Sequence, residues 1–138
     1  MVGNAEDAFD AWFYPMVQHE HVELIGHGES RVVYLVNGVV YKVGRPSANR
    51  YEHELLTAWR AAGAQWAPAT SLWEDRDPFG EAYTVIAMDY LPDDGSDPDE
   101  ATLAEIRRCA PQTCRENLHT HAGQLYLIDG VDIEVFPA

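Results

Sequence analysis

Residues 25–43 read IGHGESRVVYLVNGVVYKV, and the order of residue types in this stretch predicts consecutive β-strands around a tight turn. A glycine-rich segment opens it and is typical of a flexible turn. The run that follows is rich in the β-branched residues that favour strands. Asn37-Gly38 then predicts a type I′ hairpin, because both central positions of that turn need a positive φ. We therefore expect strands at 21–25, 31–36 and 39–43, with the last two paired directly.

Lys42 is the only lysine of the chain, whose other eight basic residues are arginines. It lies in the apolar run Val39-Val40-Tyr41-Lys42-Val43, on the third expected strand. A lysine is a compact point charge on a flexible stem, suited to one carboxylate or one phosphate in a tight site. Lys42 is therefore the first candidate for a functional side chain, the alternative being chance survival in an arginine-rich chain.

A helix is expected from Ser47 to Ala62, ended by Gly63 just beyond it. Its apolar face is expected to carry Tyr51, Leu55, Ala58, Trp59 and Ala62.

A short helix over 5–13, capped by Asn4, has its own apolar face of Phe9, Trp12 and Phe13. Four tryptophans are expected in the core or under a lid: Trp12, Trp59, Trp66 and Trp73. The remaining expected elements are two strands, a helix and a hairpin, at 67–73, 82–90, 99–108, 118–121 and 124–129.

Composition limits the classes of partner. The chain has 138 residues, 46% of them hydrophobic, and a net charge of −14, so we expect one compact domain with no nucleic-acid or anionic-membrane partner. Within it we distinguish 1–20 as an N-terminal helical segment, 21–92 as sheet and helix, and 93–138 as an acidic linker, a short helix and a hairpin. No apolar span and no basic leader are visible, which favours a cytoplasmic protein.

The order of these elements resembles the small lobe of the protein-kinase-like fold. Residues 25–34 look like the kinase glycine-rich loop, with Arg31 where the third glycine usually stands, and 39–43 looks like the lysine strand. Residues 49–56 look like the start of the helix whose glutamate pairs with that lysine, and 84–92 like the fifth strand and hinge.

Two further matches lie near the C-terminus: Asn117 looks like the magnesium-binding asparagine, and Asp129 in Leu125-Tyr126-Leu127-Ile128-Asp129-Gly130 looks like the DFG-type aspartate. The Arg-Val-Val-Tyr loop and the Asn-x-x-Glu-x-Glu helix are similar to small kinase-like proteins of bacteriophages. The implied fold class is α+β: a five-stranded antiparallel kinase-like small lobe with one main helix, plus an appended helix and hairpin.

The resemblance implies a site for ATP and magnesium. Glycine backbone groups approach phosphate oxygens, the lysine neutralises phosphate charge, and Asn117 with Asp129 would supply oxygen ligands to magnesium. Arg31 either contacts a phosphate or lies on the solvent face of its strand. The implied nucleotide-binding residues are Gly26, Gly28, Arg31, Val33, Lys42, Glu52, Asp89 and Leu91.

Two glutamates could pair with the lysine. Glu52 is favoured over Glu54, because Leu55 and Leu56 stand three and four positions after Glu52, which places it beside the buried face. Glu54 has only Ala58 at that spacing.

Several departures from the kinase pattern argue against catalysis. Counting back from Asn117, the position of the catalytic base holds Gln112, and an amide cannot accept a proton as a carboxylate does. Gly130-Val131 follows Asp129, and the chain reaches Ala138 without an activation segment or a large helical lobe. We therefore expect a truncated, pseudokinase-type protein that binds a host or partner protein, or a second copy of itself, with or without nucleotide.

Three alternatives remain. The first is a minimal ATP-dependent phosphotransferase or ATPase that uses Lys42, Asn117 and Asp129. The second is a toxin–antitoxin or phage immunity component. The third is a structural zinc site, for which the sequence offers four ligands without a standard zinc spacing: Cys109, Cys114, His119 and His121.

Overall fold

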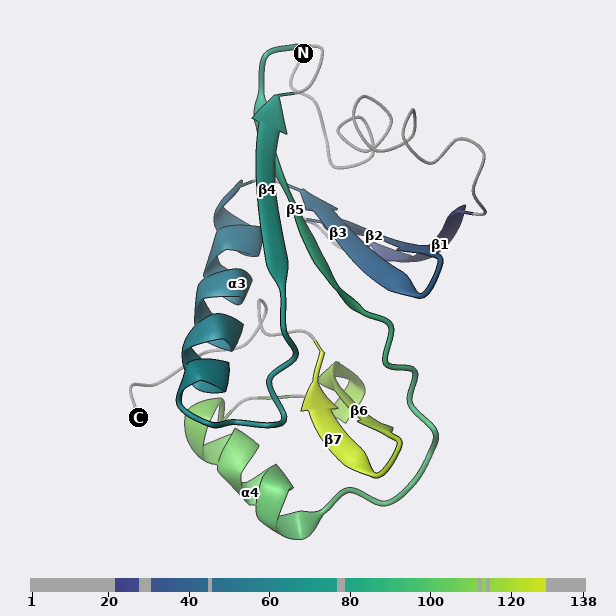
Figure 1. Ribbon diagram of the computed structural model, residues 1–138, viewed down its shortest axis with the longest axis vertical. Helices are drawn as coiled ribbons and strands as arrows, with labels where there is room; N and C mark the ends of the chain where they lie inside the picture. The colour runs from purple at the N-terminus through teal and green to yellow at the C-terminus, as the bar shows by residue number, and fades with distance from the viewer. Residues whose placement is uncertain are drawn as a thin grey trace. The chain divides into compact units, whose positions relative to one another are not determined.

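The computed structural model describes residues 22–27, 31–44, 46–76, 79–111, 113 and 115–128 (Figure 1). The helix expected over 5–13 lies outside the described residues. So do four residues singled out by the sequence: Gly28, Gln112, Cys114 and Asp129.

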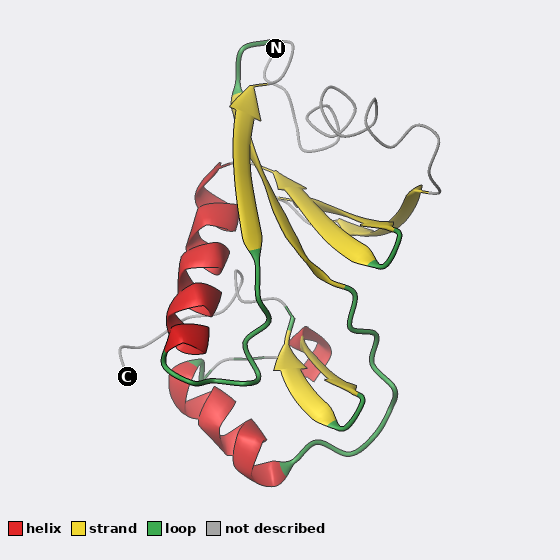
Figure 2. Ribbon diagram, viewed as in Figure 1, coloured by secondary structure: helices red, strands yellow, loops and turns green. Residues whose placement is uncertain are grey.

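The main sheet has five antiparallel strands, as the sequence predicts (Figure 2). They are β1 (Val22–His27), β2 (Arg31–Val36), β3 (Val39–Gly44), β4 (Ser71–Arg76) and β5 (Ala82–Asp89). Their spatial order is β1-β2-β3-β5-β4, so β3 is the central strand and carries Lys42. The chain is thus an α+β protein built on a five-stranded antiparallel sheet.

The predicted hairpin between β2 and β3 is confirmed. Asn37 and Gly38 have φ values of 50° and 78°, in the left-handed region that the turn requires. Pairing of Val36 with Val39 sets the register, which places Val33 opposite Lys42. These two side chains therefore project from the same face of the sheet.

The opposite face of the sheet carries an apolar core of Tyr34, Val43, Tyr83 and Val85. Because successive side chains of a strand alternate between faces, Val43 enters this core while its neighbour Lys42 projects to the other side.

Helix α3 (Pro46–Ala61) follows β3, and Gly63, with φ of 95°, lies just beyond its end as predicted. Its predicted apolar face is wrong. Tyr51 is exposed, and the fully buried residues of the helix are Asn49, Glu52 and Leu56. The reason is that cationic side chains of the sheet face the first turns of the helix. These turns therefore carry polar residues, which hydrogen-bond the cations.

Strand β4 begins at Ser71 rather than at Ala67, so the prediction of a strand over 67–73 is wrong in its first half. Pro68 has no N–H to donate to a strand ladder, which explains why the strand starts after it. Ala67 and Pro68 are nevertheless buried. Trp73, expected in the core, is 41% exposed on this edge strand.

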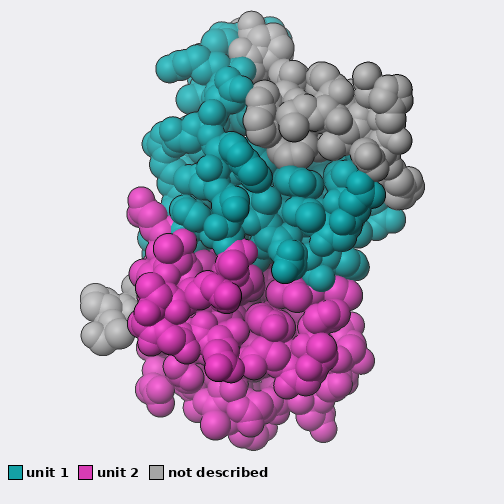
Figure 3. All heavy atoms as spheres, in the orientation of Figure 1, with its two compact units in different colours: residues 1–53, 70–90 teal, residues 54–69, 91–138 magenta. Residues whose placement is uncertain are grey.

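The described chain divides into two compact units (Figure 3). The first comprises Met1–His53 with Thr70–Tyr90 and holds the five-stranded sheet and the start of α3. The second comprises Glu54–Ala69 with Leu91–Ala138.

The second unit contains the expected helix and hairpin. Helix α4 (Glu100–Cys109) begins after Asp99, whose carboxylate accepts a hydrogen bond from the N–H of Thr102 as an N-cap. A short 3-10 turn, η2 (Arg115–Asn117), leads into the hairpin of β6 (Leu118–His121) and β7 (Gln124–Leu127). The buried large apolar side chains of this unit are Leu56, Trp66, Ile106, Leu118, Leu125 and Leu127.

Candidate functional site

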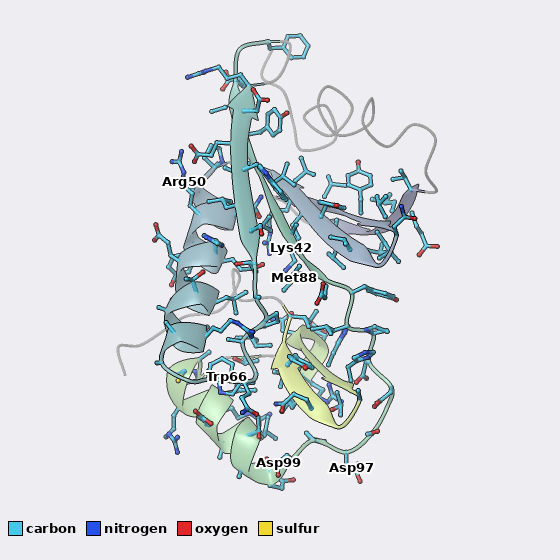
Figure 4. All side chains as sticks on the ribbon, in the orientation of Figure 1. Lys42, Arg50, Trp66, Met88, Asp97 and Asp99 are labelled. Carbon is cyan, nitrogen blue, oxygen red and sulfur yellow. The ribbon has the colours of Figure 1, made fainter. Side chains whose placement is uncertain are left out.

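The centre of the candidate site is an ion pair between β3 and α3. Nζ of Lys42 lies 2.7 Å from Oε1 of Glu52. Both residues are buried, with 4% of Lys42 and none of Glu52 exposed, and Figure 4 labels Lys42 beside the strands of the main sheet. Of the two candidate glutamates, Glu52 is therefore the partner of Lys42, while Glu54 is exposed.

Arg31 contacts the same carboxylate. Its Nη1 lies 3.2 Å from Oε1 of Glu52, and the residue is 6% exposed at the start of β2. The alternative that Arg31 lies on the solvent face of its strand is wrong. Lys42 and Arg31 thus contact the same carboxylate oxygen of Glu52. Because Nζ of Lys42 and Nη1 of Arg31 both bond it, these two nitrogens lie within about 6 Å of each other.

The charge state of Glu52 follows from these neighbours. Burial alone would raise the pKa of Glu52, but the positive charges of Lys42 and Arg31 and their hydrogen bonds more than offset it. The result is a pKa lowered from 4.5 to about 2. The carboxylate is therefore ionised at every physiological pH, and its two contacts are true ion pairs.

Asn49 completes this cluster and was missed at the level of sequence. Its side chain is fully buried. Nδ2 donates to the main-chain oxygens of Lys42 at 2.8 Å and Thr84 at 3.1 Å, and Oδ1 accepts from Nη1 of Arg31 at 3.2 Å. The one available signal was its position three residues before Glu52, which puts both side chains on the same face of the helix.

The glycine loop is described only in part. Gly26 lies in β1 opposite Val33, next to a shift of register between Leu24 and Gly26. A Cβ at Gly26 would be at an ordinary contact distance, 3.9 Å, from that of Val33. Gly28 lies outside the described residues.

The expected hinge residues lie at the end of β5. Asp89 pairs with Val39 and is exposed. The N–H of Tyr90 donates to the oxygen of Gly38 at 3.0 Å. The oxygen of Leu91 accepts a hydrogen bond from Nδ1 of His119 at 2.7 Å. Two main-chain groups of the hinge segment thus already have partners within the protein.

The expected magnesium residues belong to the second unit. Asn117 ends η2, and its main-chain oxygen accepts from the N–H of Ile128 at 2.9 Å, which closes the base of the β6–β7 hairpin. Lys42 and Glu52 belong to the first unit. Asp129 and Gln112 lie outside the described residues, so the structure places only Asn117 of this group.

The zinc alternative gains no support from the described residues. His119 and His121 lie on β6, and their Nδ1 atoms donate to the main-chain oxygens of Leu91 and Pro92, at 2.7 and 3.1 Å. Among the residues that the structure describes, no group of three or more histidine, cysteine or acidic side chains is placed to hold a metal ion. Cys109 is half-buried on α4, and Cys114 lies outside the described residues.

No family model matches this chain, and no curated protein matches it in sequence. Among its described helices, none combines the length and apolar character that a membrane crossing requires.

Proposed function

We propose that this chain is a kinase-like protein that binds the phosphates of ATP at Lys42 and acts by contacting a partner protein rather than by transferring phosphate. The observation that carries the proposal is the buried pair of Lys42 and Glu52, formed between a central strand and the helix that follows it.

A buried ion pair of this kind calls for a reason other than stability. Removing two charges from water costs several kcal/mol per ion, and well-packed apolar residues of similar volume often replace such pairs without loss. Here three charged side chains are buried together in the first unit: Arg31, Lys42 and Glu52. Clustered, charge-coupled groups with a strongly shifted pKa are typical of functional sites.

The geometry suits phosphate recognition. A lysine ammonium is a compact point charge with three donors, the kind of group that sits on a phosphate oxygen. Glu52 holds Nζ of Lys42 at 2.7 Å, which limits the positions that the amine can take. Arg31, on the same carboxylate, adds a second positive charge beside Lys42, and positive charge favours a phosphate nearby.

Magnesium fits the remaining proposed residues by chemistry. An asparagine oxygen and a carboxylate are ligands that this ion accepts, and Asn117 and Asp129 would provide them. Phosphate transfer is not proposed, because Gln112 stands where a carboxylate base is needed. Because the carboxylate base is lost, the proposal assigns the chain a role in contacting a partner protein.

The test is a calorimetric titration of ATP, with and without magnesium, into the wild type, Lys42→Ala and Arg50→Gln. Arg50 is the control because its ion pair with Glu74 is exposed and lies outside the buried cluster. We expect binding by the wild type and Arg50→Gln, and a loss of at least about tenfold in affinity for Lys42→Ala, the value of one charge-assisted contact. Absence of binding by the wild type at millimolar ATP would refute the proposal. Release of inorganic phosphate, abolished by Asp129→Asn, would instead favour the ATPase alternative.

A further inference from the structure

Both polar atoms of the Asn49 side chain have hydrogen-bond partners inside the first unit. An asparagine side chain offers two N–H donors and one acceptor oxygen. In Asn49 the amide nitrogen donates to two carbonyl groups and the oxygen accepts from a guanidinium, while none of the residue is exposed. We infer that Asn49 is a positioning residue, which holds the first turns of α3 so that Glu52 meets Lys42 before any ligand binds.

Helix α3 and strand β3 are joined by two bonds at one residue, Lys42. Asn49 bonds the main-chain oxygen of Lys42, and Glu52 bonds the ammonium of the same lysine. Because the two helix residues are three positions apart, they lie on one face, and the two bonds together fix both the rotation and the height of the helix at this strand.

The amide of Asn49 also reaches beyond β3. Asn49 also donates to the oxygen of Thr84 on the neighbouring strand β5, at 3.1 Å. Its oxygen accepts from Nη1 of Arg31 on β2, and the same Nη1 contacts Oε1 of Glu52, both at 3.2 Å. One helix residue is thereby tied to three adjacent strands of the sheet.

The pairing of Glu52 with Lys42 bears on how a ligand would bind. If the proposed ATP site exists, its lysine is already placed, so binding would not have to draw the helix toward the sheet. A site whose competent state is fully populated binds with its intrinsic affinity, whereas a partly populated one loses affinity in proportion. Without Asn49, α3 would visit positions in which Glu52 and Lys42 are apart.

The experiment uses the fact that Lys42 is the only lysine. A small amine reagent, trinitrobenzenesulfonate, is reacted with the folded protein, and its attachment to Lys42 is timed by peptide mass spectrometry. This readout needs no nucleotide, and the N-terminal amine is separated as a different peptide. The variants are Asn49→Ala and Asn49→Leu, of which the second fills the space but makes none of the three bonds.

We expect Lys42 to be modified slowly in the wild type and roughly tenfold faster in both variants, since losing a buried hydrogen bond of about 1.4 kcal/mol raises an open population tenfold. The matched control is Val85→Ala. Val85 is fully buried on the other face of the sheet, so its truncation lowers stability but leaves the bonds of Asn49 intact. It should leave the modification rate near that of the wild type.

Equal rates in the wild type and both Asn49 variants would overturn the inference, as would an equal acceleration by Val85→Ala.

A second measurement is the rate of Lys42 modification in Glu52→Gln with and without Asn49→Ala. If Asn49 acts through Glu52, Asn49→Ala changes the modification rate little once Glu52→Gln is present. If the two substitutions instead multiply the rate independently, the positioning role is contradicted. Faster modification in the Asn49 variants of a protein that binds no ATP would sustain the positioning role while refuting the proposed function.

Discussion

At the scale of single residues, the site is organised around one carboxylate that two cations share. Lys42 and Arg31 both contact Oε1 of Glu52, and this proximity holds its pKa near 2 in spite of full burial. Had burial dominated, the pKa would have risen and the carboxyl would be neutral. The structure shows the opposite balance, so the cluster depends on Glu52 being charged.

A pH dependence follows from this shift. The pKa of Glu52 is about 2 in the folded protein and 4.5 ordinarily, so its contribution to stability is complete above about pH 4.5 and is lost as the pH falls toward 2. The size of the contribution is about 3 kcal/mol. Urea unfolding of the wild type and Glu52→Gln at pH 6, 4 and 2.5 measures it. At pH 2.5, just above the folded pKa, we expect the stability difference between the two proteins to have shrunk by most of that amount, and a constant difference would contradict the assignment.

Sequence alone predicted some of these residues and not others. Lys42 could be chosen because it is unique, and Glu52 because its spacing placed it beside a buried face. The role of Asn49 could not be predicted, because a buried amide that bonds distant main-chain groups leaves no hydrophobic pattern. Arg31 stayed ambiguous for the same reason, since its partners come from a helix far along the chain.

At the scale of elements, the sequence predicted the positions of the strands better than it predicted which face of α3 is buried. Asn37-Gly38 fixed a hairpin because its backbone requirement is local. The buried face of α3 depends on what the sheet presents to it, and the sheet presents cations. Apolar periodicity therefore pointed to the wrong side, with Leu55 favoured over its neighbour Leu56, which is the residue that is fully buried.

Truncation of these two leucines tests the corrected face. Leu56→Ala should lower the free energy of unfolding by about 2–5 kcal/mol, the usual range for a buried leucine. Leu55→Ala should cost clearly less, because Leu55 is only half-buried. Chemical denaturation of both variants gives their free energies of unfolding. A larger loss of unfolding free energy for Leu55→Ala would contradict the buried face seen in the structure and favour the face predicted from sequence.

At the scale of the whole molecule, the chain is strongly acidic, with a net charge of −14, yet among the described residues two cationic side chains are buried beside one carboxylate. Composition pointed to a protein with a real core, and the order of elements to the α+β class. Neither could reveal that Lys42 and Arg31 are buried together in the first unit, where the proposal places the phosphates.

The most direct test of phosphate binding at Lys42 is labelling with an acyl-phosphate derivative of ATP. A bound derivative transfers its acyl group to a nearby amine, forming an amide and releasing the nucleotide, and the chain offers one lysine as acceptor. We predict an acylated Lys42 peptide whose yield falls when unmodified ATP is added in excess. Labelling of Lys42 that excess ATP leaves unchanged, or labelling confined to the N-terminal amine, would contradict the account.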